Sequence, residues 1–152
     1  MTDAEYASWQ LELAEAFVAE ALAAGRAMPD DAVQRELEDN ARLLPQGAAT
    51  PRMLVVTAVD ADGQRVGRAW ASLDHPRGAP DTAFLYDIEV DEEHRGTGKG
   101  KQLLAAVERA VADAGVGSLE LNVFGNNPAA LTLYASAGFT VTSQQMRKIL
   151  IP

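Results

Sequence analysis

The first part of the chain carries apolar residues at helical spacing. In residues 4–24 these positions are Tyr6, Trp9, Leu13, Ala16, Phe17 and Ala21. Because this spacing places the apolar side chains on one side of a helix, it predicts an amphipathic helix that ends at Gly25. A second helix is predicted to start after Met28, with Pro29 near its first turn, and to end at about Leu44.

The middle of the chain has the pattern of strands. Residues 53–59 and 65–73 are rich in apolar and β-branched side chains and flank a turn signal at 61–64, which predicts a hairpin. Residues 74–81 contain two prolines and a glycine and are predicted to form a loop.

The second half of the chain alternates strand and helix patterns. The predicted elements are a strand at 84–90, a helix at 99–114, a strand at 119–124, a short helix at 127–137 and closing strands at 139–142 and 146–151. Gly115 is expected to cap the longer helix at its C-terminal end. The implied fold class is α/β, a mixed sheet with helices on both faces.

Composition and charge narrow the classes of protein that fit this pattern. The 152 residues are 47% hydrophobic, which suffices for a single domain, residues 1–152. The chain has no apolar run of about eighteen residues and no N-terminal signal pattern, so a cytoplasmic protein without a membrane partner is expected. The absence of cysteine and the presence of only two histidines argue against a metal site. The net charge of −9 argues against nucleic acid as a partner.

One glycine-rich segment stands between a predicted strand and a predicted helix. Its sequence is Arg95-Gly96-Thr97-Gly98-Lys99-Gly100. Such a turn exposes backbone N–H groups at a helix N-terminus, where phosphate oxygens bind well. Gly98 and Gly100 would allow close approach of the backbone to an anion, while Arg95 and Lys99 supply charge. The spacing fits neither G-x-x-x-x-G-K-[ST] nor G-x-G-x-x-G, and it leaves R-x-x-G-x-G.

The charge of this loop is opposite to that of the whole chain. Residues 94–101 contain three cations, Arg95, Lys99 and Lys101, and no acid. The helix dipole disfavours cations in a first turn, so an anionic ligand is expected to compensate them. The alternative is a loop of ordinary solvated charges.

From about Thr82 onward the sequence resembles the acyl-CoA-dependent N-acetyltransferases of the GNAT superfamily. Two signatures carry the resemblance, R-x-x-G-x-G at 95–100 and N-x-x-A-x-x-L-Y-x-x-x-G-F at 127–139. The resemblance implies an acetyl-CoA-binding core at 82–139 and a helical acceptor-side region at 1–50. It also implies that residues 95–100 hold the pyrophosphate of acetyl-CoA.

The resemblance further implies how the sheet opens to receive the cofactor. Strands 84–90 and 119–124 are expected to run parallel and to splay apart, with the pantetheine arm in the gap. Its amides would pair there with strand backbone left open by the splay, at Ile88 and Val90.

The chemistry implied by the resemblance is direct attack of an amine on the acetyl thioester in a ternary complex. Tyr134 occupies the family position for protonating the leaving thiolate; the alternative is a ring packed in the core. Asn127 begins the short helix and either caps it or bonds the pantetheine arm. A backbone N–H near Val90 is expected to stabilise the oxyanion.

The general base is less clear. Two positions that often carry it in the superfamily are Phe84 and Asn122 here, which do not titrate. Asp87 and Glu89 are two residues apart on the predicted strand and share one face, with Tyr86 on the other. We take Asp87 first because it lies further from the loop; a structural acid pair, substrate recognition or an ordered water acting alone are the alternatives.

The acceptor is expected to be an amine of a small molecule or a peptide. Residues 1–50 contain ten acids and three basic residues, a field that favours a cationic amine. The alternative is that acidic helix faces keep the protein soluble. Two rival functions also fit, a transferase of another acyl group or to a hydroxyl, and a non-catalytic acyl-CoA sensor or interaction domain.

The N-terminal pattern departs from the family in one respect. Family members usually begin with a strand, whereas the helical pattern starts here within a few residues of Met1. The edge of the hairpin is then exposed and can pair with a second copy, so a homodimer is compatible with the sequence.

Overall fold

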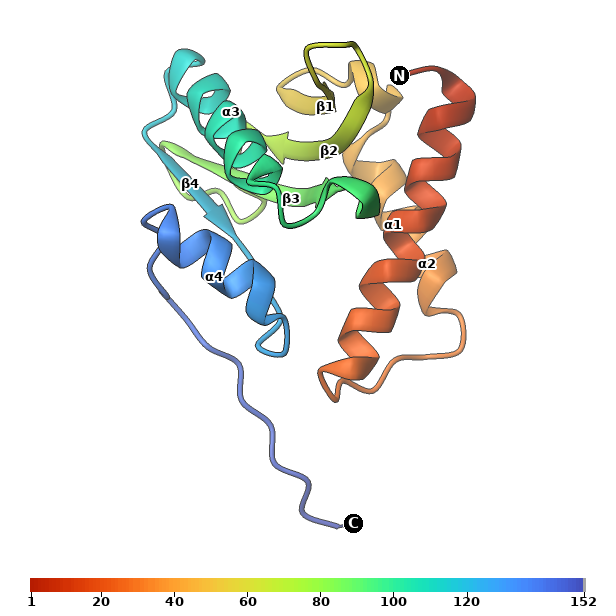
Figure 1. The fold of residues 1–152 in the computed structure, drawn as a ribbon. Helices are drawn as coiled ribbons and strands as arrows, with labels where there is room; N and C mark the ends of the chain where they lie inside the picture. The colour runs from red at the N-terminus through yellow and green to blue at the C-terminus, as the bar shows by residue number, and fades with distance from the viewer. Residues whose placement is uncertain (152) are drawn as a thin grey trace.

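In residues 1–151, four strands form a mixed sheet with helices on both faces (Figure 1). The coordinates are a computed structural model that describes these residues. The strands are β1 (Met53–Val59), β2 (Arg65–Ser72), β3 (Thr82–Val90) and β4 (Ser118–Leu121). The helices are α1 (Asp3–Ala23), α2 (Ala32–Leu43), α3 (Lys99–Asp113) and α4 (Pro128–Ser136), with 3₁₀ turns η1 (Gly47–Ala49) and η2 (Glu92–His94). Among the helices described, none is long and apolar enough to cross a membrane.

The strand order confirms the predicted fold class. The sheet runs β1-β2-β3-β4, with β1 and β3 antiparallel to β2 and with β4 parallel to β3. The hairpin predicted at 53–73 is therefore confirmed. One face of the sheet packs against α3 and the other against α1, as predicted (Figure 1).

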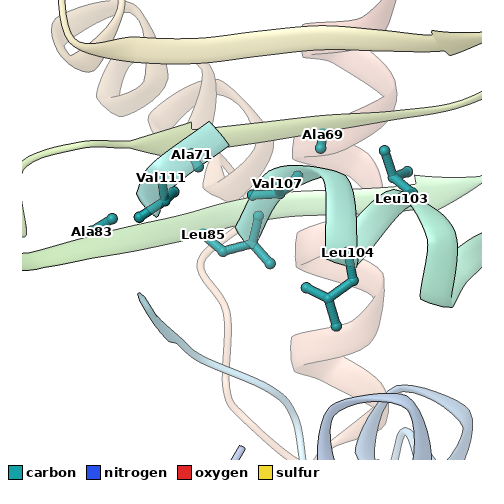
Figure 2. Packing of buried hydrophobic residues seen from close by; sticks show 8 residues of the cluster. All are labelled: Ala69, Ala71, Ala83, Leu85, Leu103, Leu104, Val107 and Val111. Carbon is teal, nitrogen blue, oxygen red and sulfur yellow. The ribbon is translucent and has the colours of Figure 1, made fainter. Parts of the chain in front are cut away.

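The face covered by α3 is lined with small side chains. Figure 2 shows the buried cluster, which consists of Ala69, Ala71, Ala83 and Leu85 from the sheet and Leu103, Leu104, Val107 and Val111 from α3. Because three of the four sheet positions are alanine, the helix can approach the sheet closely and bury its leucines. This packing fixes the N-terminus of α3 beside the end of β3.

An aromatic cluster fixes α1 against the opposite face. The rings of Trp9 in α1 and Trp70 in β2 meet edge to face with centroids 5.9 Å apart, and both residues are buried. Trp70 also stacks on Tyr86 of β3, at a centroid distance of 4.4 Å. Contacts of this kind add to the burial of a large apolar area, so α1 is held over the middle of β2 and β3.

The predicted splay of the parallel strands is confirmed. Register between β3 and β4 runs only from Thr82 opposite Ser118 to Leu85 opposite Leu121. Residues 86–90 of β3 therefore extend beyond the last pair with β4. Strand β4 is shorter than predicted, because it ends at Leu121 rather than at residue 124.

A bulge in β3 overturns one prediction about its faces. The register with β2 passes from Leu85 opposite Ala71 to Asp87 opposite Trp70, so Tyr86 is an extra residue. Such a bulge interrupts the alternation of side chains. Tyr86 consequently packs with Trp70 on the α1 side, together with Asp87, and not on the opposite face.

The start of the second helix and the closing strands were also predicted wrongly. Helix α2 begins at Ala32 and not directly after Met28, and the side chain of Asp31 pairs with Arg35 instead of capping the helix. The closing strands predicted at 139–142 and 146–151 are absent from the part of the chain that the structure describes. A strand needs a neighbouring backbone, and the chain after α4 runs away from the sheet as an extended segment (Figure 1).

Candidate active site

The glycine-rich loop follows β3 and η2 and leads directly into α3. Gly96 and Gly98 have φ values of 73° and 80°, a left-handed conformation that side chains other than glycine rarely adopt. Gly98 is the N-cap residue of α3 and has no side chain to cap it. The two glycines therefore shape a turn that leaves the helix N-terminus uncovered.

The loop presents several free donors to the same space. Within residues 1–151, no protein group accepts a hydrogen bond from the backbone N–H groups of residues 96–101. A Cβ built on Gly96 or Gly98 would meet no atom within 4 Å, so the space above both residues is open. Free N–H groups at a helix N-terminus favour an anionic ligand, and the assignment of this ligand as pyrophosphate stays a prediction.

Gly100 has a different environment from Gly98. A Cβ on Gly100 would lie 3.7 Å from Leu133 of α4 and 3.8 Å from Val90 of β3. A side chain at this position would therefore point into the contact between α3, α4 and β3. Gly100 can reach a ligand only through its backbone N–H, which lies in the first turn of α3. The contribution of Gly100 to cofactor binding stays a prediction that concerns its backbone.

The cations of the loop fall into two groups. The guanidinium of Arg95 donates hydrogen bonds to the Val90 carbonyl, with Nε 3.0 Å away, and to the Glu89 carboxylate, at 3.2 Å. Thr97 donates its hydroxyl to the carbonyl of His94. These bonds tie the loop to the end of β3. Lys99 belongs to the other group, because it forms no salt bridge within residues 1–151 and can turn toward an anion.

The backbone of β3 is open on the side where β4 diverges. The N–H of Asp91 donates to the Val66 carbonyl, at 3.0 Å. Because backbone N–H and C=O groups alternate in direction along an antiparallel pair, those of residues 89 and 91 point toward β2. The backbone groups of Ile88 and Val90 then face the gap beside β4. Both residues are where an amide-containing ligand arm could pair with the strand.

A buried arginine organises the acids on the other face of β3. Arg68 of β2 is 5% exposed, and its guanidinium contacts Asp87 at 3.2 Å, Glu12 of α1 at 2.9 Å and also Glu89. The indole Nε1 of Trp9 donates to the same oxygen of Asp87, at 3.1 Å. Asp87 and Glu89 therefore share a face, as predicted, but they share it with a cation.

The two predicted acids differ in whether a carboxylate oxygen remains free to bind a substrate. Glu89 uses one oxygen for Arg68 and the other for Arg95, so it bridges the buried arginine and the loop. Asp87 uses one oxygen, Oδ2, for both of its partners. Burial raises the pKa of Asp87, whereas the charge of Arg68 and the hydrogen bonds from Trp9 and Arg68 act in the opposite direction.

Tyr134 of α4 packs against the core on the α3 side of the sheet. Its ring packs edge to face on Phe139 with a centroid distance of 5.7 Å. Burial, and then the charges of Asp87 and Glu20, raise the pKa of Tyr134 to about 12. No hydrogen bond contributes to this shift, so the phenol hydroxyl remains available to a ligand.

Glu20 of α1 interacts electrostatically with the acids of the cluster around Arg68, which the sequence did not reveal. Partial burial raises its pKa, and the nearby charges of Asp87 and Glu89 act in the same direction. The only sequence signal was its place eight residues after Glu12, on the same side of α1. Arg68 was also missed, although an arginine in the interior of an apolar strand is a recognisable sign of a buried ion pair.

The remaining predicted residue, Asn127, has a defined structural role. Its side-chain oxygen accepts a hydrogen bond from the Ala130 N–H, at 3.1 Å, and so caps α4. Nearby, Phe124 packs against Phe17 of α1 with a ring distance of 5.8 Å, which joins α1 to the loop before α4. Contact between Asn127 and the pantetheine arm stays a prediction.

In residues 1–151, no His, Asp and Glu side chains are grouped so as to hold a metal ion.

Comparison with known families assigns this arrangement to a class. Residues 12–139 match the family described as the acetyltransferase (GNAT) family. The chain therefore belongs to the GNAT family and is an acetyltransferase, as the two sequence signatures predicted. The GNAT fold accounts for the mixed sheet with helices on both faces and for the splayed pair β3 and β4.

Several relatives resemble the chain over different lengths. It is 33% identical to the uncharacterized N-acetyltransferase YycN of Bacillus subtilis (strain 168), with 99% of this chain and 96% of the relative covered. The crystal structure of that protein superposes with a TM-score of 0.89 over 100% and 96% of the two chains, at 31% identity. The L-2,4-diaminobutyric acid acetyltransferase of Nocardia farcinica is 35% identical over 57% of this chain and 42% of its own length. A structure of AAC(6')-Iy with a bisubstrate analogue, CoA-S-monomethyl-acetylneamine, has a TM-score of 0.56 at 25% identity and covers 83% of each chain.

Proposed function

We propose that this protein transfers the acetyl group of acetyl-CoA to a primary amine of a small molecule or peptide by direct attack in a ternary complex. The observation that carries the proposal is the free N-terminus of α3 at the glycine-rich loop, next to the part of β3 that extends beyond its last pair with β4. A carboxylate that can receive a proton from an amine and a phenol that can donate a hydrogen bond to a leaving group add support, since the charge of Asp87 acts on the Tyr134 hydroxyl.

The loop and the open strand are assigned to holding acetyl-CoA, which supplies an activated acetyl thioester when bound. The free N–H groups of residues 96–101 and the side chain of Lys99 would bind the pyrophosphate. The backbone of Ile88 and Val90 would pair with the pantetheine arm. The Val90 carbonyl already accepts from Arg95, so its N–H is the group assigned to stabilising negative charge on the acetyl oxygen.

The acidic cluster is assigned to the amine. One buried guanidinium, Arg68, is surrounded by Glu12, Asp87 and Glu89, and Glu20 adds a further negative charge. The excess of negative charge attracts an ammonium group, which must lose a proton before it can attack. Asp87 is assigned to receiving that proton through a water, because its raised pKa makes it a stronger base than an ordinary carboxylate.

Tyr134 is assigned to the leaving sulfur. A phenol with a pKa of about 12 keeps its proton at any physiological pH. Complete transfer of that proton to a thiolate with a pKa of about 8.5 is uphill, so the hydroxyl acts chiefly by donating a hydrogen bond as negative charge develops. The Tyr134 hydroxyl can therefore donate this hydrogen bond at any physiological pH.

The pH dependence of kcat follows from this assignment. Because Tyr134 holds its proton up to a pKa of about 12, its deprotonation produces no decline of kcat between about pH 8 and about pH 10. We expect kcat at saturating substrates to rise as the carboxylate ionises, with a midpoint above the usual value of about 4 for an aspartate, and then to stay level. A decline centred near pH 9 that disappears in Tyr134→Phe would contradict the role given to the hydroxyl.

Substitution of Glu20 tests the site of the amine. Glu20→Gln removes a negative charge near the acidic cluster and is expected to raise KM for a diamine about tenfold. The KM for a monoamine that carries no other charged group should change little. The matched control is Glu15→Gln on the same helix, which removes the same charge from a residue that contributes to the pKa of neither Tyr134 nor Asp87.

The function itself is tested by following release of coenzyme A from acetyl-CoA with a panel of amines and alcohols. Diamines and amino-group-rich compounds are expected to be acetylated faster than neutral alcohols. The relative named for L-2,4-diaminobutyric acid supports including that compound in the panel. Faster turnover with alcohols than with every amine would refute the assignment of the acceptor class.

A further inference from the structure

The acidic cluster and the glycine-rich loop share one residue, Glu89. One carboxylate oxygen of Glu89 pairs with the buried guanidinium of Arg68, and the other accepts a hydrogen bond from Arg95 of the loop, at 3.2 Å. Arg68 in turn contacts the Oδ2 atom of Asp87 through its Nε, at 3.2 Å. A continuous series of charged contacts therefore runs from the loop to Asp87.

The inner end of this series is buried. Arg68 is 5% exposed, and its side chain pairs with three acids, Glu12, Asp87 and Glu89. Because a buried guanidinium has little water to replace a lost partner, a change in one of these contacts changes the others. The attraction that Arg68 exerts on Asp87 thus depends on how closely Glu89 approaches the same guanidinium.

The outer end of the series is open to a ligand. The side chain of Arg95 is 57% exposed and that of Glu89 is 39% exposed, so an anion at the loop can reach the guanidinium of Arg95. An ion pair exposed to this degree contributes little to stability and is easily exchanged. A pyrophosphate carries two negative charges and competes with the single charge of Glu89 for Arg95.

We propose that Arg68 and Glu89 are positioning residues that transmit the binding of acetyl-CoA at the loop to the carboxylate of Asp87. When the pyrophosphate takes Arg95, Glu89 pairs more closely with Arg68, and Arg68 attracts Asp87 less. A carboxylate with a weaker ion pair holds a proton more strongly, so Asp87 becomes the better base once the acetyl donor is in place. The inference rests on the proposed function, in which acetyl-CoA binds at the loop and Asp87 receives the proton of the amine.

The charges around Asp87 act in the direction that this coupling requires. Burial raises the pKa of Asp87, the charge of Arg68 lowers it, and the charge of Glu89 raises it. Glu20 of α1 and Tyr134 of α4 also interact electrostatically with Asp87. Within residues 1–151, neither of these two side chains pairs with a cation of the loop. Arg68 and Glu89 are therefore the ionic connection between the loop and Asp87 in the described residues.

Trp9 of α1 provides a spectroscopic reporter of Asp87. Its indole N–H donates to Oδ2 of Asp87, at 3.1 Å, and Arg68 contacts the same oxygen. The chain has only one other tryptophan, Trp70, whose buried indole N–H has no hydrogen-bond partner within residues 1–151. The two indole resonances of isotopically labelled protein therefore distinguish a change at Asp87 from a general change in the core.

The experiment records both indole N–H resonances by NMR with and without saturating acetyl-CoA, and calorimetry on the same samples measures binding. When Arg68 attracts Asp87 less, Oδ2 accepts more strongly from Trp9. The Trp9 resonance of the wild-type protein is therefore expected to move downfield when acetyl-CoA binds, while the Trp70 resonance stays in place.

The Glu89→Gln variant removes the connection and should bind acetyl-CoA without the shift of the Trp9 resonance. The matched control is Glu93→Gln, which removes the same charge beside the loop. The Glu93 side chain is 79% exposed and, within residues 1–151, forms no ion pair with Arg68 or Arg95, so the shift should remain.

The outcomes separate this inference from the proposed function. Bound acetyl-CoA with an unchanged Trp9 resonance in the wild-type protein would overturn the coupling and leave the site of acetyl-CoA intact. A full shift in Glu89→Gln, or loss of the shift in Glu93→Gln, would show that the charge of the ligand acts on Asp87 without this ionic connection. Absence of acetyl-CoA binding to the wild-type protein would refute the proposed site itself, and the inference with it.

Discussion

The Tyr134→Phe protein is expected to turn over at about one hundredth of the wild-type kcat. The substitution removes one hydroxyl and keeps the ring that packs on Phe139, so the position of α4 should not change. Tyr134 is half-buried, and burial, together with the charges of Asp87 and Glu20, raises the pKa of its hydroxyl. Its contribution is therefore made to the transition state, and the affinity for acetyl-CoA should stay within about threefold of wild type.

The matched control for this variant is Tyr6→Phe. Tyr6 is a half-buried tyrosine that packs on Trp9 with ring centroids 5.6 Å apart, and burial rather than an acidic neighbour raises its pKa. Loss of its hydroxyl should leave kcat unchanged. If Tyr134→Phe also retains the wild-type kcat with its preferred amine, then the hydroxyl has no part in the chemistry and the leaving sulfur is stabilised by another group.

The Gly98→Val protein is expected to bind acetyl-CoA with a Kd at least on the order of 10²-fold higher than wild type. Valine is strongly disfavoured at a φ of 80°, and its side chain would project into the open space where the pyrophosphate is placed. The helix N-terminus and its free N–H groups would then be covered. Isothermal titration calorimetry with acetyl-CoA measures the change directly.

Gly78→Val separates the loss of the binding space from backbone strain. Gly78 lies in the loop before β3 with a φ of 73°, and a Cβ built there also meets nothing within 4 Å. Both valine variants should lose a similar amount of stability, on the order of 1–2 kcal/mol. Only Gly98→Val should lose acetyl-CoA binding. An equal loss of affinity in both variants would show that strain, and not occlusion of the loop, is responsible.

The conformation of the glycine-rich loop is the part of the candidate site that the sequence predicts best; its binding of pyrophosphate stays a prediction. Glycines at 96 and 98 and three local cations are local signals, and the conformation that they favour does not depend on distant residues. The role of Arg95 was harder to foresee. Its guanidinium is bound to Glu89 and to the Val90 carbonyl, and that contact depends on how the loop folds back on β3.

The acidic cluster depended on tertiary structure. Glu12 and Glu20 looked like ordinary solvated residues of an amphipathic helix, because nothing in the helix pattern shows what it packs against. Only the placement of α1 over the sheet brings Glu12 to Arg68 and lets the charge of Glu20 act on Asp87 and Glu89. The bulge at Tyr86 was equally invisible, since a strand pattern assumes strict alternation and one extra residue reverses it.

The C-terminal segment, residues 140–151, shows the limit of strand propensity. Its β-branched residues correctly indicated an extended backbone, but propensity does not specify the partner that completes a strand. A single chain leaves those residues exposed.

The most direct test of the central claim is thermal unfolding with and without saturating acetyl-CoA. At about 100 times Kd, binding adds roughly 2.7 kcal/mol, which raises Tm by about 5–11 °C in a domain of this size. The account predicts that shift for the wild-type and Gly78→Val proteins and its loss in Gly98→Val at the same concentration. A folded wild-type protein with an unchanged Tm, or a full shift in Gly98→Val, would contradict the placement of acetyl-CoA at this loop.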